Sequence, residues 1–518
     1  MDRRGFLRAS LLVGAAGSAG LAAFAVRQFS AGGDPVGRAR RALAGTTTAP
    51  RPTLPATTTV PPVHGVYAGW VEHENAQPGT ADWNIANLGD PHSIEGFFDT
   101  VSANVDDIVR LYVSTTAPTY HIEAYRMGWY QGLGGRLIWR SPELPGRVQP
   151  PATVDPNTNM VEAPWQDPYP IGIGTEFVPG CYLFKLVASS TAARFVPFTV
   201  REDSNNSAYL VMNAVTTWQA YNGWGGNSLY LGAGRGGQSF ANRSRVVSFD
   251  RPYEDNGAPE FLGVELPVVR LVERLGLDVT YTTNVDVHRN PQLLLNHKAL
   301  VSLGHDEYYS TSMRDGVETA RDHGVNLAFL GANAVFRQIR FEPSALGVDR
   351  HEVCYKSANE DPIRNTNPEL TTVNWRDAPV GRPENRLLGG QYECNPVSAD
   401  MVITHPDSWV FANTGLQQGD RLPGVVGGEY DHYSPGSGVP DNVEVLAHSP
   451  VTCQGRSSYA DMTYYTAASL AGVFDTGTQA WITHLDSPNQ LQHVVEITTN
   501  LLTVFGRGPA GLYYPSRP

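Results

Sequence analysis

The chain has 518 residues, a length typical of two or three domains, and its 41% hydrophobic and 10% aromatic residues exclude a globally disordered protein. The 51 acidic residues outnumber the 38 lysines and arginines, so the formal net charge is −13. Because an acidic body repels phosphate backbones, we expect no nucleic-acid partner.

The N-terminal segment has the features of an export signal. Arg3 and Arg4 precede a run of small and apolar residues over 11–26, which is too short for a confident membrane span. This pattern is typical of a twin-arginine signal, which we predict over residues 1–29. The alternative interpretation is a short membrane anchor. We therefore expect an exported protein that is extracellular, periplasmic, or tethered to the membrane or cell wall.

A linker and a group of short strands come next. Residues 30–62 are rich in Thr, Pro and Ala and lack apolar periodicity, which predicts an extended linker. Several β-rich runs separated by Pro- and Gly-rich turns then follow. They include residues 107–114, 120–126, 182–188 and 195–201. Short strands without helical stretches predict an immunoglobulin-like β-sandwich over residues 63–202.

The remainder of the chain alternates strands with helices. Apolar runs predict strands over 208–213, 299–303 and 326–330, and we predict two more strands over 278–282 and 480–484. Helical spacing appears over 267–275, 291–295, 311–323 and 490–505. Strands that are apolar throughout indicate a parallel sheet covered on both faces, so we predict a doubly wound α/β domain over 203–518. The stretch 341–478 is rich in predicted loops.

The strongest candidate for chemistry lies at two strand ends. In an open parallel sheet, ligands bind beyond the carboxyl ends of the strands. The strand at 299–303 runs into Gly304-His305-Asp306-Glu307-Tyr308-Tyr309, and Asn333 follows the next strand. We expect these side chains to meet at one edge. A structural alternative makes Asp306 or Ser310 the N-cap of the following helix.

Two aromatic clusters are further candidates. Residues 217–226 set aromatic rings, among them Trp218 and Tyr221, between glycines, which indicates a loop around a pocket rather than a regular element. Residues 248–253 end on Tyr253. Packing alone is the alternative for either tyrosine. The sequence has no GxSxG or HExxH motif and no cysteine near 303–310, so a serine hydrolase or a cysteine amidotransferase would lack its nucleophile.

The four cysteines form no CxxC pair, which argues against a thiolate zinc site or an iron–sulfur cluster. In an exported protein they could form up to two disulfides. We expect either a Cys354–Cys394 bond, which would clamp the polar stretch 357–391, or buried free thiols.

Seven segments together resemble the C-terminal portion of the N,N-dimethylformamidase beta (large) subunit family. The segments are Tyr120–Gly135, Thr217–Gly226, Ser248–Tyr253, Gly304–Ser310, Gly331–Arg337, Gly427–Asp431 and Val473–Thr478. Their order and spacing cover roughly residues 65–505. The resemblance implies a β-sandwich followed by a glutamine-amidotransferase-like α/β domain.

The resemblance also implies a mononuclear ferric iron, Fe(III), held by two tyrosinates and one glutamate. Phenolate and carboxylate are hard oxygen donors that suit such an ion, and together they balance its three positive charges. Matched motif by motif, the implied metal ligands are Tyr221, Tyr253 and Glu307. The implied catalytic residues are His305, Asn333 and Glu429, and the implied pocket residues are Phe474 and Trp218.

These features predict an exported, iron-dependent hydrolase of an amide C–N bond in a small molecule or an envelope compound. The characterised type has an extra N-terminal domain and a separate small subunit, so a small partner subunit or a homo-oligomer is compatible with the resemblance. A second hypothesis is a catalytically inactive secreted protein that binds glycan or protein. A third is a metal-independent hydrolase that uses the carboxylates of Glu307 and Glu429.

Overall fold

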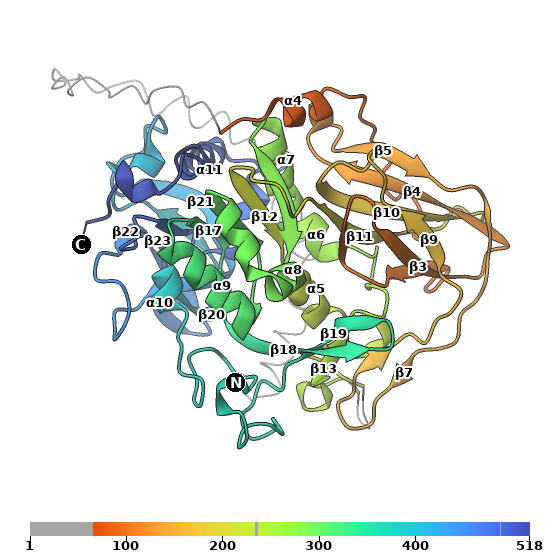
Figure 1. Cartoon of the computed structure of the whole chain (residues 1–518). Helices are drawn as coiled ribbons and strands as arrows, with labels where there is room; N and C mark the ends of the chain where they lie inside the picture. Colours follow the sequence, from red (N-terminus) through yellow and green to blue (C-terminus); the bar gives the residue numbers. More distant parts are fainter. Residues whose placement is uncertain (1–65, 234–236, 487, 518) are drawn as a thin grey trace, which may run out of the picture.

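The computed structural model describes residues 66–233, 237–486 and 488–517, and Figure 1 shows a strand-rich part beside a part with mixed helices and strands. The predicted signal at 1–29 and the linker at 30–62 lie outside the described residues. Within the described ranges, no helix is long and apolar enough to cross a membrane.

The strand-rich part contains two sheets that share a core. One sheet has the order β1-β3-β9, and the other has the order β2-β11-β10-β4-β5 with β6 paired to β4. The strands are β1 (Ile94–Phe98), β2 (Ser102–Asn104), β3 (Ile108–Thr115), β4 (Thr119–Met127), β5 (Gly135–Arg140), β6 (Leu144–Pro145), β9 (Tyr169–Gly172), β10 (Gly180–Ala188) and β11 (Ala193–Arg201). The four predicted strands are confirmed as β3, β4, β10 and β11.

Aromatic side chains fill the space between these two sheets. The ring of Phe98 on β1 lies 4.9 Å from that of Phe184 and 4.7 Å from that of Phe198, centroid to centroid. Phe184 and Phe198 belong to the opposite sheet, so apolar burial across the two layers stabilises the sandwich. A small hairpin of β7 (Thr153–Val154) and β8 (Val161–Glu162) extends from it.

A seven-stranded sheet forms the centre of the second part, with the order β14-β12-β15-β17-β24-β23-β22. Its first five strands are parallel, and β23 and β22 add antiparallel to that edge. The strands are β12 (Tyr209–Asn213), β14 (Val279–Thr283), β15 (Ala299–Gly304), β17 (Asn326–Gly331), β22 (Glu444–Cys453), β23 (Arg456–Thr466) and β24 (Gly472–Asp475). Numbered along the chain, the parallel strands follow the order 2-1-3-4-5. The direction in which successive strands are added to the sheet reverses between β12 and β15. Open sheets bind ligands at such a switch point.

Helices cover both faces of this sheet. Val211 on β12 packs with α7 (Leu266–Arg274) and α11 (Gln492–Phe505) on one face, and the next residue, Met212, packs with α8 (Asn284–Arg289) and α9 (Thr311–Asp322) on the other. Successive residues of a strand point to opposite faces, so a strand apolar throughout is buried on both sides. The prediction of a parallel sheet covered on both faces is confirmed for the five parallel strands, and the antiparallel strands β23 and β22 are an addition to it. Further helical segments are α4 (Gly69–Asn75), α5 (Val215–Tyr221), α6 (Pro259–Val264), α10 (Asn385–Leu388), η1 (Tyr130–Gly132), η2 (Trp224–Gly226), η3 (Phe240–Asn242), η4 (Pro291–Asn296), η5 (Pro368–Leu370), η6 (Trp409–Phe411) and η8 (Ala510–Leu512).

The stretch 341–478 is richer in strands than its sequence indicates. It contains the strands β22, β23 and β24 of the seven-stranded sheet, a further short strand, and two long antiparallel strands that form a sheet of their own. The additional strands are β13 (Val246–Ser248), β16 (Tyr308–Ser310), β18 (Arg337–Ser344), β19 (Gly347–Val353), β20 (Gly390–Val402) and β21 (Arg421–Tyr433).

Two predictions about this part of the chain are wrong. Residues 480–484 lie in a 3-10 helix, η7 (Gln479–His484), rather than a strand. Ala480, Trp481 and Ile482 are all buried, and a short buried run has no periodicity that separates a strand from a helix. The predicted Cys354–Cys394 bond is also wrong, because Cys394 pairs with Cys453, while Cys354 is a buried free thiol.

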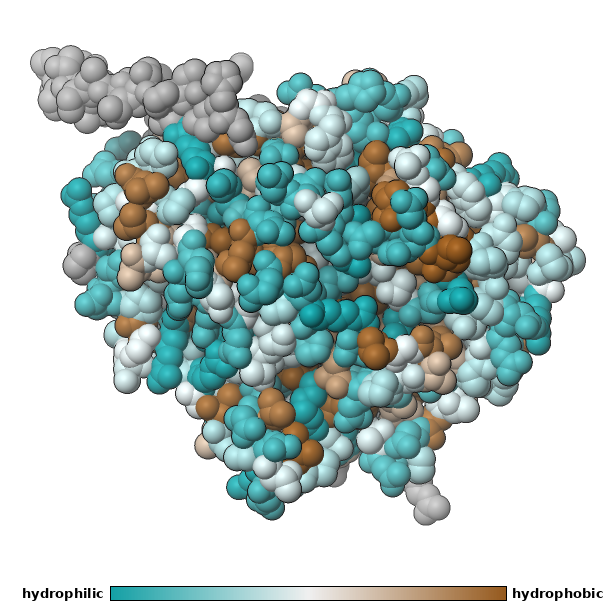
Figure 2. All heavy atoms as spheres, in the orientation of Figure 1, coloured by the Kyte–Doolittle hydropathy of each residue, from teal (hydrophilic) through white to brown (hydrophobic). Residues whose placement is uncertain are grey.

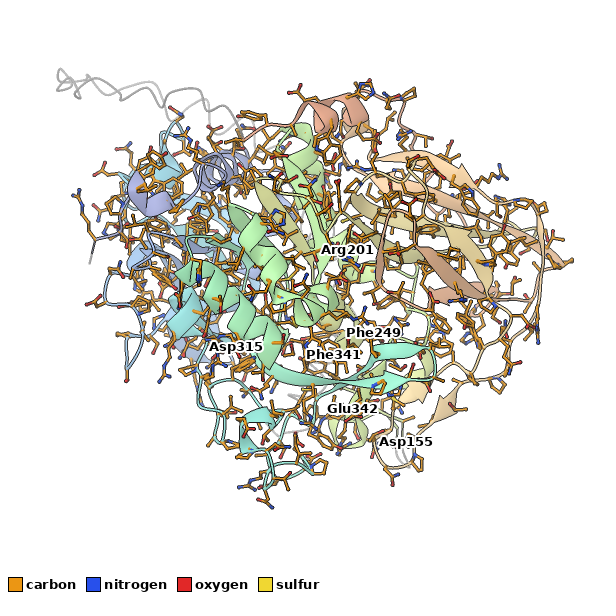
Figure 3. The ribbon with its side chains drawn as sticks, viewed as in Figure 1. Asp155, Arg201, Phe249, Asp315, Phe341 and Glu342 are labelled. Atoms are coloured by element: carbon orange, nitrogen blue, oxygen red, sulfur yellow. A yellow bond between two sulfur atoms is a disulfide. The ribbon has the colours of Figure 1, made fainter. Side chains whose placement is uncertain are left out.

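Buried ion pairs join the two parts. Arg126 on β4 meets Glu273 on α7 with a nitrogen–oxygen distance of 2.7 Å, and both side chains are fully buried. Arg201, labelled in Figure 3 between the sandwich and the helices, meets Asp286 on α8 at 3.1 Å. The two parts are therefore held together through polar as well as apolar contacts.

The face of the molecule drawn in Figure 2 is mostly hydrophilic, with apolar side chains scattered in small groups.

Candidate active site

The site forms where β15 and β17 end side by side. Gly304 pairs with Gly331 in parallel register, so the segments that follow both strands leave from the same edge, as predicted. Gly304 has a φ of +56°, a conformation that favours glycine and turns the chain out of the strand. A Cβ on Gly331 would overlap the backbone oxygen of Gly304, so the close approach of the strands requires glycine there. His305 and Glu307 follow, and only 5% and 1% of their surfaces are exposed.

Backbone hydrogen bonds fix Glu307 in place. Its N–H donates to Thr217 Oγ1 on α5 at 3.0 Å. Its carbonyl accepts from the N–H groups of Phe336 and Arg337, both at 2.9 Å. Since α5 follows β12, these bonds join the segments that leave β12, β15 and β17. Glu307 therefore stands on a rigid support at the switch point of the sheet.

Asp306 and Ser310 have structural contacts. Asp306 accepts from Ser302 Oγ at 2.7 Å, Tyr309 Oη at 2.6 Å and Asn284 Nδ2 at 3.0 Å. Ser310 is the N-cap of α9, its Oγ accepting from the N–H of Met313. The alternative that Ser310 is an N-cap is therefore confirmed. Asp306 is not a cap, and its carboxylate instead links β15 to β16 through hydrogen bonds.

Three oxygen atoms converge above this support. Tyr221 Oη lies 2.9 Å from Tyr230 Oη and 2.9 Å from Glu307 Oε2, and Tyr230 Oη lies 2.9 Å from the same carboxylate oxygen. A separation near 2.9 Å is what neighbouring ligands have around an octahedral cation with metal–oxygen bonds of about 2.0–2.1 Å. The donors are also the hard type that a trivalent ion prefers. The residues present therefore fit such an ion.

Tyr230 was not recognised in the sequence. The N–H of Leu229 donates to the carbonyl of Ala220 at 2.9 Å, which folds the chain back along α5. The rings of Tyr221 and Tyr230 then stack with centroids 4.4 Å apart. This fold-back depends on a turn after α5 that is rich in glycine and asparagine. The only feature of the sequence that could have indicated Tyr230 as a site residue is its position at that turn. The expectation of a loop rather than a regular element over 217–226 is wrong for its first half, because α5 extends to Tyr221, and the second half contains the short 3-10 helix η2.

Tyr253 lines the same cavity as Tyr221 but makes no described hydrogen bond to the three oxygens. Its ring packs against that of Trp218 with centroids 6.3 Å apart. Among the described residues, the tyrosine hydroxyls that donate to Glu307 are those of Tyr221 and Tyr230. The structure therefore brings together two of the three expected ligand side chains and places Tyr230, rather than Tyr253, beside them.

Basic side chains surround the cluster. Burial raises the pKa of the Glu307 carboxyl, but hydrogen bonding and charge from His305, with Lys356 and Arg337, more than reverse this and lower the pKa to about 2. Arg337 Nε lies 3.3 Å from Glu307 Oε1. Burial, followed by the negative charge of Glu307, raises the pKa of Tyr221 well above the ordinary value. The phenols therefore hold their protons unless a cation binds between them, and a bound cation favours the phenolate.

Lys356 extends this network behind Tyr230. Its Nζ donates to Tyr308 Oη at 2.7 Å and lies 3.1 Å from the centroid of the Tyr230 ring. Tyr308 Oη in turn donates to Tyr230 Oη at 2.8 Å. The hydroxyl of Tyr230 is thus held by Tyr308 as well as by Glu307.

His305 lies between two carboxylates. Its Nε2 is 3.4 Å from Glu307 Oε2 and 3.2 Å from Glu429 Oε2 on β21. Burial lowers the pKa of His305, but Glu429 and Glu307 outweigh burial and hold this pKa well above its ordinary value. The imidazole can therefore carry a proton between the two carboxylates. Glu429, placed by the sequence in the catalytic set, is brought into contact with His305.

A buried carboxyl pair supports Asn333. The backbone N–H of Asn333 donates to Asp431 Oδ1 at 2.8 Å, and Asn333 has a φ of +59°. Burial raises the pKa of Asp431 to about 7, and burial together with Asp431 raises the pKa of Asp475 well above its ordinary value. Neighbouring buried carboxyls that cannot both ionise share a proton. The loop that carries Asn333 thus rests on a carboxyl pair that is partly protonated.

The Asp475→Asn variant is expected to flatten the pH dependence of stability. A carboxyl whose pKa is higher in the folded than in the unfolded state stabilises the fold at low pH. That contribution is lost as the pH rises from about 4 towards the folded-state pKa. With one carboxyl of the pair replaced, the free energy of unfolding should fall less between pH 4 and pH 8. Urea unfolding across this range measures the change, and an unaltered slope would contradict the expectation.

A cavity with an empty volume of about 440 Å³, a figure that includes open solvent, adjoins Tyr221. Its wall includes Trp218 and Tyr253, together with the carboxylate-bearing Glu254 and Glu260. Phe474, the other expected pocket residue, is fully buried within β24 and belongs to the main apolar core, and the described wall does not include it. Trp218 donates from Nε1 to Glu265 Oε1 at 2.8 Å, which fixes its ring at the cavity.

Comparisons with known proteins show the family to which the chain belongs. The family model described as "N,N-dimethylformamidase beta subunit-like, C-terminal" matches residues 121–494. The chain belongs to this family. The N,N-dimethylformamidase beta subunit of Paracoccus aminophilus is 23% identical over 328 residues, which cover 52% of this chain and 40% of that protein. The N,N-dimethylformamidase beta subunit of an Alcaligenes species is 22% identical over 328 residues, which again cover 52% of this chain and 40% of that protein.

The dimethylformamidase-like region contains the whole candidate site. Tyr221, Tyr230, His305, Glu307 and Glu429 all lie within the matched residues. The aligned region is less than half the length of each curated relative, so the chain spans only part of what those proteins contain. The family resemblance seen in the sequence is confirmed. The roles of the individual residues rest on the geometry described above.

Proposed function

We propose that this protein is an exported, iron-dependent hydrolase that cleaves the C–N bond of an amide in a small molecule or an envelope compound. The observation that carries the proposal is the triangle of oxygens from Tyr221, Tyr230 and Glu307, with 2.9 Å between each pair. Two phenolates and one carboxylate would balance the charge of a single Fe³⁺. Membership of the dimethylformamidase beta subunit-like family supports amide chemistry.

A ferric ion bound by these residues would supply Lewis acidity, polarising an amide carbonyl and acidifying water. The protein's own groups would manage the protons. Glu429 would accept a proton from the attacking water, and His305, 3.2 Å from Glu429 Oε2, would pass a proton to the leaving amine. Asn333, held by Asp431, would donate a side-chain hydrogen bond to the developing oxyanion, a contribution typically of about 2.7–4 kcal/mol.

The cavity beside Tyr221 would admit the substrate. Its volume of about 440 Å³ includes open solvent, so it suits a compact amide or the amide end of a larger compound. Trp218 and Tyr253 would form its aromatic wall. Burial of His305 and Glu307 keeps bulk water from the reacting groups and strengthens their electrostatic interactions.

Several finer assignments belong to the same proposal. We propose that the sandwich is immunoglobulin-like and the second part glutamine-amidotransferase-like, with the domain boundaries predicted from the sequence. Export by the twin-arginine route fits the Arg3-Arg4 pattern, and the Cys394–Cys453 disulfide fits an oxidising compartment. Because the curated relatives are named beta subunits, a second, smaller subunit is a proposed partner. A homo-oligomer is the other proposed assembly.

The proposal is tested by loading the full chain with iron and screening small amides for release of amine. We expect hydrolysis and a visible tyrosinate-to-iron charge-transfer band in the loaded protein, with both lost on iron removal. Hydrolysis that survives strong chelation would favour the metal-independent carboxylate mechanism of Glu307 and Glu429. A colourless protein without amidase activity would favour the inactive binding protein.

A further inference from the structure

A bulge in β20 lies opposite Glu429. Along the pairing of β20 with β21, Cys394 is opposite Tyr430 but Val397 is opposite Gly428, so two residues of β20 lie against the single residue Glu429. A bulge of this kind bends the strand and redirects a side chain. The redirected side chain is that of Asn395, whose Nδ2 donates to Glu429 Oε1 at 2.6 Å. Only 6% of the Glu429 surface is exposed, so this bond lies in a protected environment.

Covalent and polar contacts hold the bulge in place. Cys394, next to Asn395, forms the disulfide with Cys453, the last residue of β22. Gln454 Nε2 donates to the carbonyl of Asn395 at 2.9 Å. Since β22 belongs to the seven-stranded sheet, the bulge is fastened to that sheet although β20 pairs only with β21.

Glu429 has a contact at each of its oxygens. Oε1 accepts a hydrogen bond from Asn395, and Oε2 forms an ion pair with His305 Nε2 at 3.2 Å that lacks hydrogen-bond geometry. A carboxylate with one oxygen bound can still rotate about its last bond, but a second fixed contact defines its plane. The contact to Asn395 therefore fixes the orientation in which the other oxygen of Glu429 faces His305.

We propose that Asn395 is a positioning residue that aims the Glu429 carboxylate at His305, and that the Cys394–Cys453 disulfide holds Asn395 in register. This inference rests on the proposed function, in which Glu429 handles the proton of the attacking water. Among the described hydrogen bonds, the side-chain amide of Asn395 contacts only Glu429, so Asn395 acts through that residue. A misplacement of about 1 Å in such a group can cost roughly 100-fold in rate.

The kinetic test uses the iron-loaded full chain. We expect Asn395→Ala to lower kcat about 10- to 100-fold while KM, iron content and the visible band stay close to those of the unmodified protein. The Cys394→Ala/Cys453→Ala double variant should also lower kcat, as Asn395→Ala does. The matched control is Asn442→Ala: this asparagine is also partly buried and donates to Thr466 and Ser516, away from the site, and its loss should leave kcat unchanged.

A double-mutant cycle separates positioning from a general structural effect. In a Glu429→Gln background, Asn395→Ala should cause little further loss, because the group that Asn395 positions is already removed. Losses that multiply, or an unaltered kcat in Asn395→Ala, would overturn the inference.

A crystal structure of Asn395→Ala tests the positioning without any activity. We expect the Glu429 carboxylate to move away from His305 Nε2, whereas a distance still near 3.2 Å would overturn the inference. If the loaded wild-type protein hydrolyses no amide but the carboxylate moves as expected, the proposed function fails and the positioning contact stands. The two failures are therefore distinguishable.

Discussion

Replacing Tyr230 by phenylalanine is expected to abolish iron binding, the visible band and amide hydrolysis. The hydroxyl of Tyr230 provides one of three oxygens that lie 2.9 Å apart, and two donors alone would leave Fe³⁺ with one negative charge fewer. Loss of a ligand should cost more than the roughly 10- to 100-fold in affinity that loss of a supporting contact costs. Iron content after gel filtration and absorption of the loaded protein provide the measurements.

Tyr253→Phe is the matched variant, because Tyr253 is an equally aromatic, partly exposed residue close by that packs against Trp218. It should retain iron and the visible band, since its hydroxyl does not donate to Glu307 among the described contacts. The opposite outcome, colour lost in Tyr253→Phe and kept in Tyr230→Phe, would show that the ligand set read from the sequence was right and that the geometric assignment is wrong.

The sequence was sufficient to predict the strands and helices around the sheet because their patterns are local. The strand β12 is apolar up to its last residue, Asn213, and the helix α9 keeps its apolar residues on one face, so each element could be recognised alone. The long strands β20 and β21 escaped prediction because their burial is irregular and their pairing passes through bulges. Their structure depends on contacts between distant segments rather than on a local pattern.

The same difference between local patterns and contacts of distant segments applies to the residues of the site. Glu307 and His305 were predictable because they directly follow an apolar strand, and the carboxyl ends of parallel strands share an edge. Tyr230 and Asn395 were not, because one reaches the site through a backbone fold-back and the other through a bulge. Neither the fold-back nor the bulge produces a periodic pattern in the sequence. Likewise, the pairing of Cys394 with Cys453 follows from the approach of β20 to β22, which sequence spacing does not reveal.

The Glu273→Gln variant is expected to lose about 3–5 kcal/mol of unfolding free energy, the cost of removing one partner of a buried ion pair. Arg126 and Glu273 are both fully buried, and Tyr281 Oη also donates to this carboxylate at 2.7 Å. Burial lowers the pKa of Arg126, but Glu273 outweighs it and the pKa stands well above the ordinary value, so the guanidinium stays charged. Without its partner, that charge remains between the sandwich and α7. Urea unfolding followed by tryptophan fluorescence measures the loss.

Two further variants separate charge burial from other causes. The Arg126→Met/Glu273→Leu double variant removes both charges and should recover much of the lost stability, because apolar pairs often replace buried ion pairs without net cost. Asp167→Asn breaks the pair with Arg147, whose side chains are 75% and 52% exposed, and should change stability by about 1 kcal/mol or less. A Glu273→Gln variant as stable as Asp167→Asn would mean that the charge of Arg126 is compensated by its other neighbours, Tyr130 and the carbonyl of Pro179, and that the junction between the two parts does not depend on this ion pair.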